Sequence, residues 1–428
     1  MGDKDSRLRY LDLFAGAGGL SEGFIREGFS PVAHVEMSKA ACNTLRTRAA
    51  YHYLNTVGKS GIYCDYLSGK ITREAFYSNI PSKILESIIC ETISARTMDS
   101  IFNKIDNLKG EGTIDLIVGG PPCQAYSLMG RARDPDGMVY DKRNYLFSFY
   151  IKFLLRYKPS FFVFENVLGL LSAKDKAGYK YFDMMQEGFE KSGYRICYKT
   201  LNAKDYGVLQ NRKRVFIIGK RTNDEFEFSW PPKVTCSSTV SAIFSDLPSL
   251  KAGQGNCRKS QLSPNPDKWL IDSKIRSIDS SLPVTFHCSR NHSKRDLKIY
   301  KIAVEQWSKS HSRLRYADLP KELKTHKNQE TFLDRFKVVS SSDSASQTVV
   351  AHIAKDGHYY IHPDIEQNRS LTPREVARLQ SFPDDYYFES VSGKPSRTEA
   401  YKQIGNAVPV LLSQVIARSI YEAIINEH

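Results

Sequence analysis

From Arg9 to Gly219 the chain alternates short apolar runs with longer amphipathic segments, and no other feature constrains its fold as strongly. This alternation is typical of a parallel β-sheet covered by helices. The expected strands are 10–14, 32–36, 114–118, 161–165 and 215–218, and the expected helices are 20–27, 40–53, 73–107, 145–156 and 181–191. We therefore predict a doubly wound α/β domain whose ligand sites lie at the carboxyl ends of its strands.

The sequence changes character after Gly219. Ser, Gly, Asn and Pro accumulate from Trp230 to Pro266 without strand–helix alternation, so a domain boundary is expected near residue 228. Basic and aromatic residues follow, in a pattern that indicates a surface for a polyanion. They are Arg290, His292, Lys294, Arg295, Lys298, Arg313, Arg315, Tyr316, Lys324, Lys327, Arg335 and Lys337. A helix is expected to start at Thr372-Pro-Arg-Glu375, and a last helix at 409–426.

Composition excludes some classes of protein. The 428 residues are 41% hydrophobic and 25% charged, which is typical of globular proteins. Lys and Arg outnumber Asp and Glu by 61 to 47, and the net charge of +14 favours nucleic acid as a partner, although many soluble proteins are basic without one. Apolar runs are shorter than a membrane span, and the N-terminus lacks the apolar region of a secretory signal, so we expect no membrane contact and a cytoplasmic location.

The eight cysteines are far apart and form no CxxC pair. This spacing favours reduced thiols over a disulfide framework, and it predicts no metal site.

A glycine-rich turn, Asp12-Leu-Phe-Ala-Gly-Ala-Gly-Gly-Leu20, joins the first expected strand to a helix. Gly16, Gly18 and Gly19 would let the backbone approach a nucleotide-like ligand at the N-terminus of that helix. The spacing lacks the third glycine of GxGxxG, which disfavours a dinucleotide. A tight turn without a ligand is the alternative interpretation.

Two carboxylates support an adenosine ligand. Glu36 ends the second expected strand, where a carboxylate can accept hydrogen bonds from both ribose hydroxyls. Asp65 follows Ile62-Tyr-Cys and is expected at a similar strand end, facing an adenine amino group. Either carboxylate could instead cap a helix.

The expected strand before residue 119 runs into Gly119-Gly-Pro-Pro-Cys-Gln124. Two prolines fix the backbone there, so Cys123 would be held rigidly at the carboxyl edge of the sheet, as a nucleophile requires. A buried cysteine with a packing role is the alternative.

An acid is expected at the same edge, and two arginines precede the last expected strand. Glu165 ends the next strand, and burial there would favour its protonated form. In Gln210-Asn-Arg-Lys-Arg214, strand alternation places Arg212 and Arg214 on one side, where they could hold a phosphate or a carbonyl oxygen. A solvated basic turn is the alternative.

In order and in content, these motifs resemble those of the 5-methylcytosine-forming DNA methyltransferase family. The resemblance also includes the closing motif Gln403-Ile-Gly-Asn-Ala-Val-Pro409 and the helix around 369–383, so it extends from Tyr10 to the last helix. It implies a Rossmann-like S-adenosylmethionine-dependent catalytic domain, 1–228 completed by 395–428, and a smaller target-recognition domain, 229–394. A stretch of about 50 residues between Asp65 and Ile114 departs from the family pattern, and its role is not predicted.

The resemblance assigns roles to individual residues. It implies that Phe14 stacks on adenine, Glu36 holds the ribose and Asp65 the adenine edge. Further cofactor contacts are implied for Gly16, Gly18, Gly19, Met37, Tyr66, Pro121, Leu146 and Asn406.

The implied reaction is methyl transfer from S-adenosylmethionine to carbon 5 of a flipped-out cytosine in a specific double-stranded DNA sequence. Cys123 would add to the base, Glu165 would face ring nitrogen 3, Arg214 would hold the ring carbonyl, and Arg212 would order the backbone. Residues 124–144, with Arg131, Arg133 and Arg143, would form a lid on the DNA. The resemblance implies a monomeric bacterial enzyme, associated with DNA and paired with a restriction endonuclease of the same specificity.

Three other functions are alternatives to this interpretation. A tRNA-methylating relative carries the same catalytic parts, although the long basic second domain favours DNA. A non-catalytic DNA-binding paralogue is disfavoured by the intact Cys123, Glu165 and arginine pair. A nicotinamide dehydrogenase is disfavoured by the absence of GxGxxG.

Overall fold

The computed structural model describes residues 7–122, 145–277, 281–325 and 333–426. In this part of the chain a seven-stranded sheet has the order β3-β2-β1-β4-β5-β7-β6. Its strands are β1 (Arg9–Leu13), β2 (Ser30–Glu36), β3 (Ile88–Cys90), β4 (Leu116–Gly119), β5 (Phe161–Asn166), β6 (Tyr194–Asn202) and β7 (Lys213–Arg221). Strands β1 to β5 pair in parallel, whereas β7 is antiparallel to both β5 and β6. The predicted doubly wound α/β domain is confirmed.

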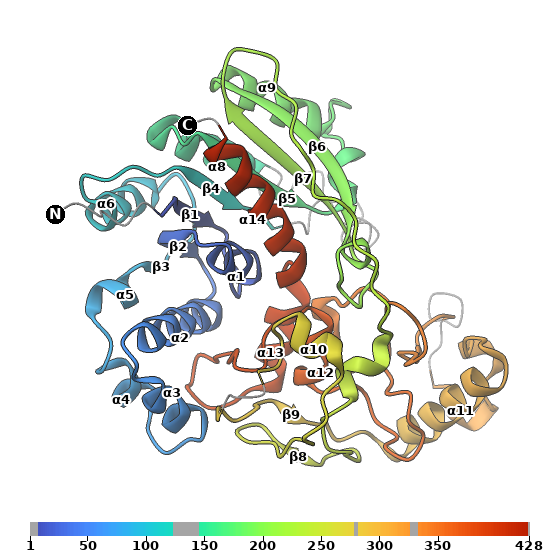
Figure 1. The fold of residues 1–428 in the computed structure, drawn as a ribbon. Coiled ribbons are helices and arrows are strands. Elements are labelled where there is room, and N and C mark those ends of the chain that lie inside the picture. Colours follow the sequence, from blue (N-terminus) through green and yellow to red (C-terminus); the bar gives the residue numbers. More distant parts are fainter. Residues whose placement is uncertain (1–6, 123–144, 278–280, 326–332, 427–428) are drawn as a thin grey trace.

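Helices cover both faces of this sheet (Figure 1). One face packs on α6 (Met98–Lys109), α8 (Leu146–Tyr157) and α9 (Tyr181–Lys191). The other face packs on α1 (Gly19–Arg26) and α14 (Val410–Ile425). Because strand side chains alternate between faces, Leu11 and Leu13 join the first core, whereas Tyr10 joins the second.

One predicted helix was wrong, and two strands were not predicted. The expected helix 73–107 is instead α4 (Arg73–Tyr77), α5 (Ser82–Glu86), β3 and α6, because Pro81 precedes a new helix and the β-branched pair Ile88-Ile89 forms a strand. Strand β6 was also missed, because only two of its nine residues are buried and it lacks a buried apolar run.

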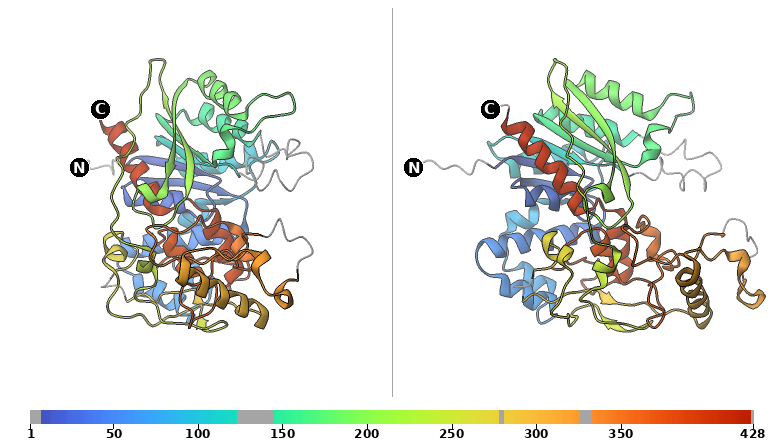
Figure 2. Two further views of the ribbon diagram at one scale, coloured as in Figure 1. Left: turned by 90° about the vertical axis from the view of Figure 1, so that its right-hand side faces the viewer. Right: turned by 45° about the vertical axis from the view of Figure 1, so that its right-hand side comes forward.

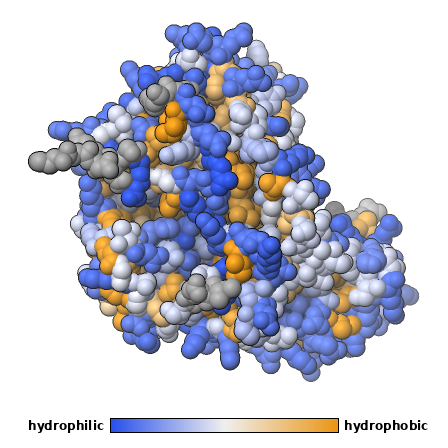
Figure 3. Space-filling view, viewed as in Figure 1, coloured by the Kyte–Doolittle hydropathy of each residue, from blue (hydrophilic) through white to orange (hydrophobic). Residues whose placement is uncertain are grey.

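Helix α14 runs along the sheet and reaches the surface at its end. By length and composition alone, the stretch Arg397–Ile425 could span a membrane, but half of its most apolar window is buried inside the protein. Its buried residues, which include Leu412, Ile416 and Ile420, pack on α1 and the sheet. The face of the molecule that carries α14 is largely hydrophilic in Figure 3. These observations identify α14 as a core helix of a globular domain.

Most of the described residues between 229 and 406 lie in the lower half of the molecule in Figure 1, beside α2 (Lys39–Thr56), α3 (Ser60–Leu67), α4 and α5, as short elements joined by irregular chain. The elements are β8 (Gly255–Asn256), β9 (His287–Cys288), α10 (Lys268–Asp272), α11 (Lys294–Ser310), α12 (Pro373–Leu379) and α13 (Arg397–Asn406). Helix α11 has a small core of its own, formed with Leu314, Tyr316 and Phe336. A disulfide joins Cys257 to Cys288, so the expectation of reduced thiols is wrong for this pair. The two cysteines are 31 residues apart, and no local motif announces such a contact.

The residues that follow α12 pack against the first half of the chain. Tyr386 donates a hydrogen bond to the carbonyl of Ala17 (2.5 Å), and Arg48 pairs with Asp385 (2.7 Å). The predicted division into a catalytic domain (1–228 with 395–428) and a target-recognition domain (229–394) stays a prediction. Asp385 and Tyr386 fall in the second of these domains but pack directly on the first.

The segment of unpredicted role braces the two halves together. It starts at the end of α3, which packs beside α2. Tyr66 donates a hydrogen bond to Glu389 (2.5 Å), and Arg73 donates one to the carbonyl of Ser390 (2.9 Å). Arg258, from the second half, donates to the carbonyl of Tyr66 (3.2 Å). Both halves are therefore held by contacts across more than 190 residues of sequence.

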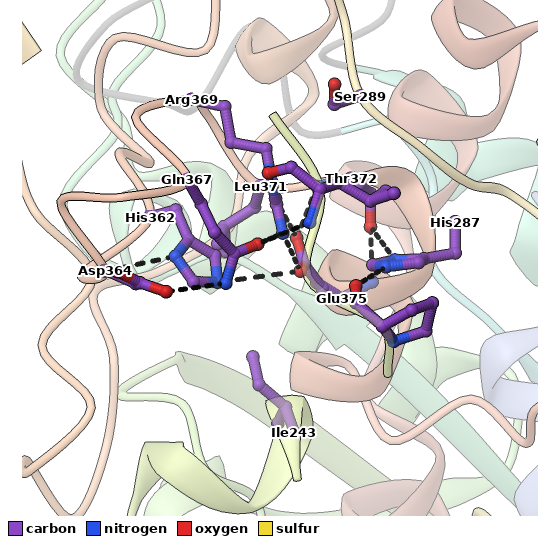
Figure 4. A network of polar contacts seen from close by, with 12 residues as sticks. Ile243, His287, Ser289, His362, Asp364, Gln367, Arg369, Leu371, Thr372 and Glu375 are labelled. Atoms are coloured by element: carbon purple, nitrogen blue, oxygen red, sulfur yellow. Dashed lines mark hydrogen bonds and ion pairs between the residues drawn. The ribbon is translucent and has the colours of Figure 1, made fainter. Parts of the chain in front are cut away.

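Helix α12 begins as its sequence predicts. Thr372 Oγ1 accepts a hydrogen bond from the amide of Glu375 (3.3 Å), and Glu375 Oε2 accepts one from the amide of Thr372 (2.6 Å), which completes a capping box. Arg369 donates two hydrogen bonds to the same carboxylate, and His287 Nδ1 lies 3.1 Å from Thr372 Oγ1 (Figure 4). Burial alone would raise the pKa of Glu375, but the Arg369 guanidinium outweighs it and lowers that pKa.

The buried guanidinium of Arg378 is expected to carry much of the stability of this half. It bonds both oxygens of Asp384 (2.9 and 2.6 Å) and Oδ1 of Asp246 (2.6 Å). Arg378→Ala removes the nearest cation from two buried carboxylates and leaves them only the longer pairs of Asp246 with Arg276 (3.3 Å) and of Asp384 with Arg374 (4.0 Å), so we expect the free energy of unfolding in urea to fall by about 3 kcal/mol. Arg418→Ala removes an exposed pair with Glu27 and should cost less than about 1 kcal/mol. Equal losses would contradict this account.

Candidate active site

The carboxyl ends of β1, β2, β4 and β5 meet at one edge of the sheet. After β1 the chain passes to β2 and β3 on one side, and it later returns to β4 on the other side of β1. The point between β1 and β4 is therefore a topological switch point, where doubly wound sheets bind ligands. The glycine-rich turn follows β1 at this point, and the proline turn follows β4.

In the glycine-rich turn the three glycines have different roles. A Cβ atom on Gly18 would lie 2.8 Å from both Leu45 Cδ2 and Tyr386 Oη, and one on Gly19 would lie 2.4 Å from the carbonyl of Val408. Packing against the backbone therefore excludes a side chain at Gly19, and the positive φ of 80° disfavours one at Gly18. Gly16 has a φ of +55° and faces open space, so its backbone is accessible to a ligand. Phe14, which is half-buried, also has a positive φ of 56°, a strained conformation that is common at functional sites.

Glu36 joins the turns that follow β1 and β2. Its Oε2 accepts a hydrogen bond from the amide of Gly16 (2.8 Å), and its Oε1 accepts one from the amide of Ser38 (2.7 Å). Burial raises the pKa of Glu36, and the backbone hydrogen bonds oppose that shift. Each carboxylate oxygen retains a further lone pair for a ligand. Beside it, Met37 exposes 61% of its surface, an apolar side chain left open at the edge of the sheet.

The expected position of Asp65 is wrong. Asp65 lies within α3, is exposed and pairs with Lys70 (2.8 Å), while Tyr66 stacks on Phe76 in the core. The short apolar run before Asp65 fits a helix as well as a strand, and the helix forms because Tyr63, Tyr66 and Leu67 share its buried face. The carboxylate that follows the third strand is Glu91, which the sequence reading missed.

Cys123 and the expected lid 124–144, with its three arginines, lie outside the described residues. The turn that leads to them is described as far as Pro122, and it packs closely on β5. A Cβ atom on Gly120 would lie 2.3 Å from the carbonyl oxygen of Glu165 and 2.9 Å from its Oε2. Asn166 Nδ2 donates a hydrogen bond to the carbonyl of Pro121 (3.3 Å).

Asn166 is a positioning residue that the sequence reading missed. Its side chain is 1% exposed, and its Oδ1 also accepts a hydrogen bond from the amide of Val167 (2.9 Å). A buried amide at the end of an apolar strand must find partners, and that requirement is the signal that could have identified it.

Glu165 and Arg214 form an ion pair at the same edge. Arg214 Nε lies 2.8 Å from Glu165 Oε1, and both side chains are nearly buried, at 13% and 15% exposed. Burial raises the pKa of Glu165, and the charges of Arg214 and Arg212 oppose the shift. Because burial favours the protonated carboxyl and the two arginine charges favour the carboxylate, Glu165 can accept or release a proton with little change in its surroundings. The structure brings together these two residues, as predicted.

Arg212 occupies a different environment. Its side chain is 1% exposed and donates hydrogen bonds to the carbonyls of Val349 (2.5 Å) and Gly405 (3.3 Å). Gln210 accepts from the amide of Val349 (2.8 Å) and donates to the carbonyl of Leu379 (3.0 Å). The basic turn therefore ties the catalytic sheet to the second half of the chain, and Gln210 is a member of this connection that the sequence reading did not single out.

The remaining expected cofactor residues come from α8 and α13. Leu146 is the first residue of α8 and is half-buried, and Asn406 is the last residue of α13 and is exposed. Among the residues that the structure describes, no cluster of three His, Cys, Asp or Glu side chains could hold a metal ion.

The sequence and the fold of this chain are similar to those of known proteins. The family model described as C-5 cytosine-specific DNA methylase matches residues 8–60 and 73–422. The chain belongs to this family. It is a DNA cytosine-5 methyltransferase, with the Rossmann-like fold of S-adenosylmethionine-dependent methyltransferases.

Relatives extend over nearly the whole of this methyltransferase. It is 39% identical to the type II methyltransferase M.Bpa9945I of Bacillus paralicheniformis, over 98% of this chain and 99% of that protein. It is 32% identical to M.DdeI of Desulfomicrobium norvegicum, over 96% of this chain and 88% of that protein. A crystal structure of a prophage-encoded E. coli protein, described as a DNA modification methyltransferase, matches with a TM-score of 0.61 at 22% identity, covering 98% and 99% of the two chains.

Gly120→Ala should disturb the proline turn of this methyltransferase. The added methyl group would collide with Glu165, so the turn must shift. A displacement near 1 Å can lower turnover by about 100-fold, and we expect a loss of this size in a DNA methylation assay. Gly61→Ala is the matched control, because its Cβ atom would meet open space on α3. Full activity of Gly120→Ala would show that the close packing on Glu165 is not needed.

Proposed function

We propose that this methyltransferase transfers a methyl group from S-adenosylmethionine to carbon 5 of cytosine in a specific double-stranded DNA sequence. The observation that carries the proposal is the nearly buried Glu165–Arg214 pair packed against the proline turn that leads to Cys123. An acid and a guanidinium beside the turn that leads to a cysteine match the requirements of nucleophilic addition to a cytosine ring.

The cofactor site would lie at the switch point of the sheet. Glu36 would accept hydrogen bonds from the ribose hydroxyls, the open backbone of Gly16 would face the ligand, and Phe14 and Met37 would offer apolar surface to the adenine. Pro121, Leu146 and Asn406 would complete the pocket. Glu91 replaces Asp65 as our candidate for the adenine edge, because it follows β3 at the same edge of the sheet. When bound, S-adenosylmethionine supplies an electrophilic methyl group on sulfonium sulfur.

The residues of this chain would activate the base. The Cys123 thiolate adds to carbon 6 of cytosine, and the electron pair of the 5,6 double bond becomes available at carbon 5. Glu165 donates a hydrogen bond or proton at ring nitrogen 3, Arg214 binds the ring carbonyl, and Arg212 holds the backbone around them. After methyl transfer, loss of the carbon-5 proton expels the thiolate and restores the double bond. Because carbon 6 is stacked inside a duplex, the cytosine must be flipped out first.

The second half of the chain would recognise the DNA sequence. Of the basic residues expected there, Lys294, Arg295, Lys298, Arg313 and Arg315 are exposed, whereas Arg290 donates to the carbonyl of Ile353 and stacks on Tyr401. We propose that the exposed set contacts DNA. We further propose that the enzyme is a bacterial, DNA-associated monomer that protects the target of a restriction endonuclease; M.Bpa9945I and M.DdeI are both bacterial, which supports the bacterial origin.

A covalent trap tests the mechanism. In DNA with 5-fluorocytosine at the target, Cys123 can still add and the methyl group can still transfer, but fluorine cannot leave as a cation, so elimination stalls. We expect an adduct that forms with S-adenosylmethionine, survives denaturation and maps by peptide mass to the segment around Pro121-Pro122-Cys123. Bisulfite sequencing of DNA from expressing cells supplies the target sequence.

Cys123→Ser should form no adduct, and Cys64→Ser, at a partly exposed thiol on α3, is the matched control that should form it normally. An adduct that persists in Cys123→Ser, or that maps to another peptide, overturns the assignment of the nucleophile.

Calorimetry tests the cofactor site. Glu36→Ala removes two backbone hydrogen bonds and the proposed ribose acceptor, so affinity for S-adenosylmethionine should fall by about 10- to 100-fold. Glu86→Ala removes one exposed carboxylate from α5 and should bind like the wild-type protein. If the wild-type protein binds S-adenosylmethionine no better than NAD, the proposed cofactor is wrong.

A further inference from the structure

A tight turn between β5 and α9 presents three lysines and an exposed tyrosine. Strand β5, which carries Glu165, is followed by a short 3-10 helix, Leu168–Leu171, and then by residues 174–180, which we call the lysine turn. Lys174 and Lys180 pair as an antiparallel bridge, and α9 begins at Tyr181. The lysine turn therefore leaves the same edge of the sheet as the candidate active site.

The lysine turn is a built structure. Asp175 Oδ1 accepts hydrogen bonds from the amides of Ala177 and Tyr179, both at 2.9 Å, and the amide of Asp175 donates to the carbonyl of Tyr179 (2.9 Å). At its base, the buried residues Ala173 and Tyr181 are joined by a backbone hydrogen bond of 3.1 Å. The carboxylate within the turn is thus used to shape the backbone, and the lysines keep a net positive charge.

The side chains of the lysine turn face solvent. Lys174, Lys176 and Lys180 are exposed, and Tyr179 exposes 67% of its surface, more than any other large hydrophobic residue in the described part of the chain. Lysine ammonium groups and a tyrosine hydroxyl are among the groups that bind DNA phosphates, which are recognised without regard to sequence. Exposure of this combination on an ordered turn points to a polyanionic partner.

The position of the turn favours DNA as that partner. The right view of Figure 2 shows the loop that precedes α9 and the helix α11 on the same side of the molecule, the loop above and the helix below. Lys294, Arg295 and Lys298 are exposed on α11. A duplex that contacts this helix and the active-site edge would pass close to the lysine turn.

We propose that the lysine turn binds the phosphate backbone of double-stranded DNA outside the recognition sequence, and that it contributes affinity but not specificity. This inference rests on the proposed function. A hollow of about 280 Å³ beside the turn is lined by Lys174 and Lys180 and also by Asp183 and Glu187 of α9. These carboxylates repel phosphate, so the contacts would lie on the lysine side and not in the hollow.

The experiment compares two triple variants of the full-length chain. One is K174Q/K176Q/K180Q, and the control is K59Q/K83Q/K204Q, which removes the same charge from exposed positions on other elements. Affinity for a random-sequence DNA duplex is measured by fluorescence anisotropy at a series of NaCl concentrations. Thermal unfolding confirms that both variants fold.

Loss of phosphate contacts lowers the slope of log affinity against log salt by about 0.9 for each contact. We expect this slope, which is negative, to be shallower by about 2–3 in the lysine-turn variant, and the affinity at low salt to be at least tenfold weaker. The control should keep the wild-type slope. At saturating DNA, the yield of the 5-fluorocytosine adduct should be the same in both variants, because the chemistry is untouched.

A lysine-turn variant with the slope of the wild-type protein, or with the same change as the control, overturns the inference. Failure of the wild-type protein to form the adduct would contradict the proposed mechanism instead, and the salt slopes would still decide whether the turn binds DNA.

Discussion

The parallel pairing of β1 with β4 is the constraint on which the site depends. Leu13 pairs with Gly119, and a Cβ atom on Gly119 would lie 2.0 Å from the carbonyl oxygen of Leu13, so only glycine allows this approach. The pairing places the glycine-rich turn after β1 beside the proline turn after β4. Because the next strand, β5, pairs with β4 in parallel, Glu165 reaches the same edge. Three separate segments thereby supply one site.

Buried charge connects this site to the rest of the chain. Arg212, Arg369, Arg374 and Arg378 are among the largest fully buried side chains. Each donates hydrogen bonds to carbonyls or carboxylates of the second half, and Arg212 does so from the base of β7. Burying a guanidinium is costly unless its donors are satisfied, so the contacts of Arg212 favour one arrangement of the two halves, and those of the other three hold the second half together. The orientation of the DNA-facing half relative to the catalytic edge follows from that geometry.

Charge is divided unequally over the molecule. Several basic residues of the second half turn inward: His292 bonds Ser370, and burial lowers the pKa of His292 to about 4, so it is neutral at physiological pH. Others, on α11 and on the lysine turn, face solvent. Composition alone cannot separate the buried basic residues from the exposed ones. An arginine that donates a hydrogen bond to a backbone carbonyl and one that is free to bind phosphate contribute equally to the net charge.

Much of the fold was predictable because its signals are local. The alternation of apolar runs predicted five of the strands, and the capping box predicted the start of α12. Glu165 and Arg214 were singled out as site residues because each lies next to an apolar run that is easy to recognise, but their ion pair was not predicted. Asp65 was misplaced because a short apolar run fits a helix or a strand, and only packing of Tyr63 and Tyr66 into the core selects the helix.

The sequence by itself determined five strands of the sheet, the turns after β1 and β4 and the types of residue placed at the catalytic edge. Tertiary structure alone decided that Gln210 meets Val349, that Arg73 braces Ser390 and that Cys257 reaches Cys288. The physical reason is the range of the interactions. Periodicity and turn chemistry act over a few residues and leave a pattern in the sequence, whereas partners far apart in the chain are selected by shape and by hydrogen bonding after the chain has folded.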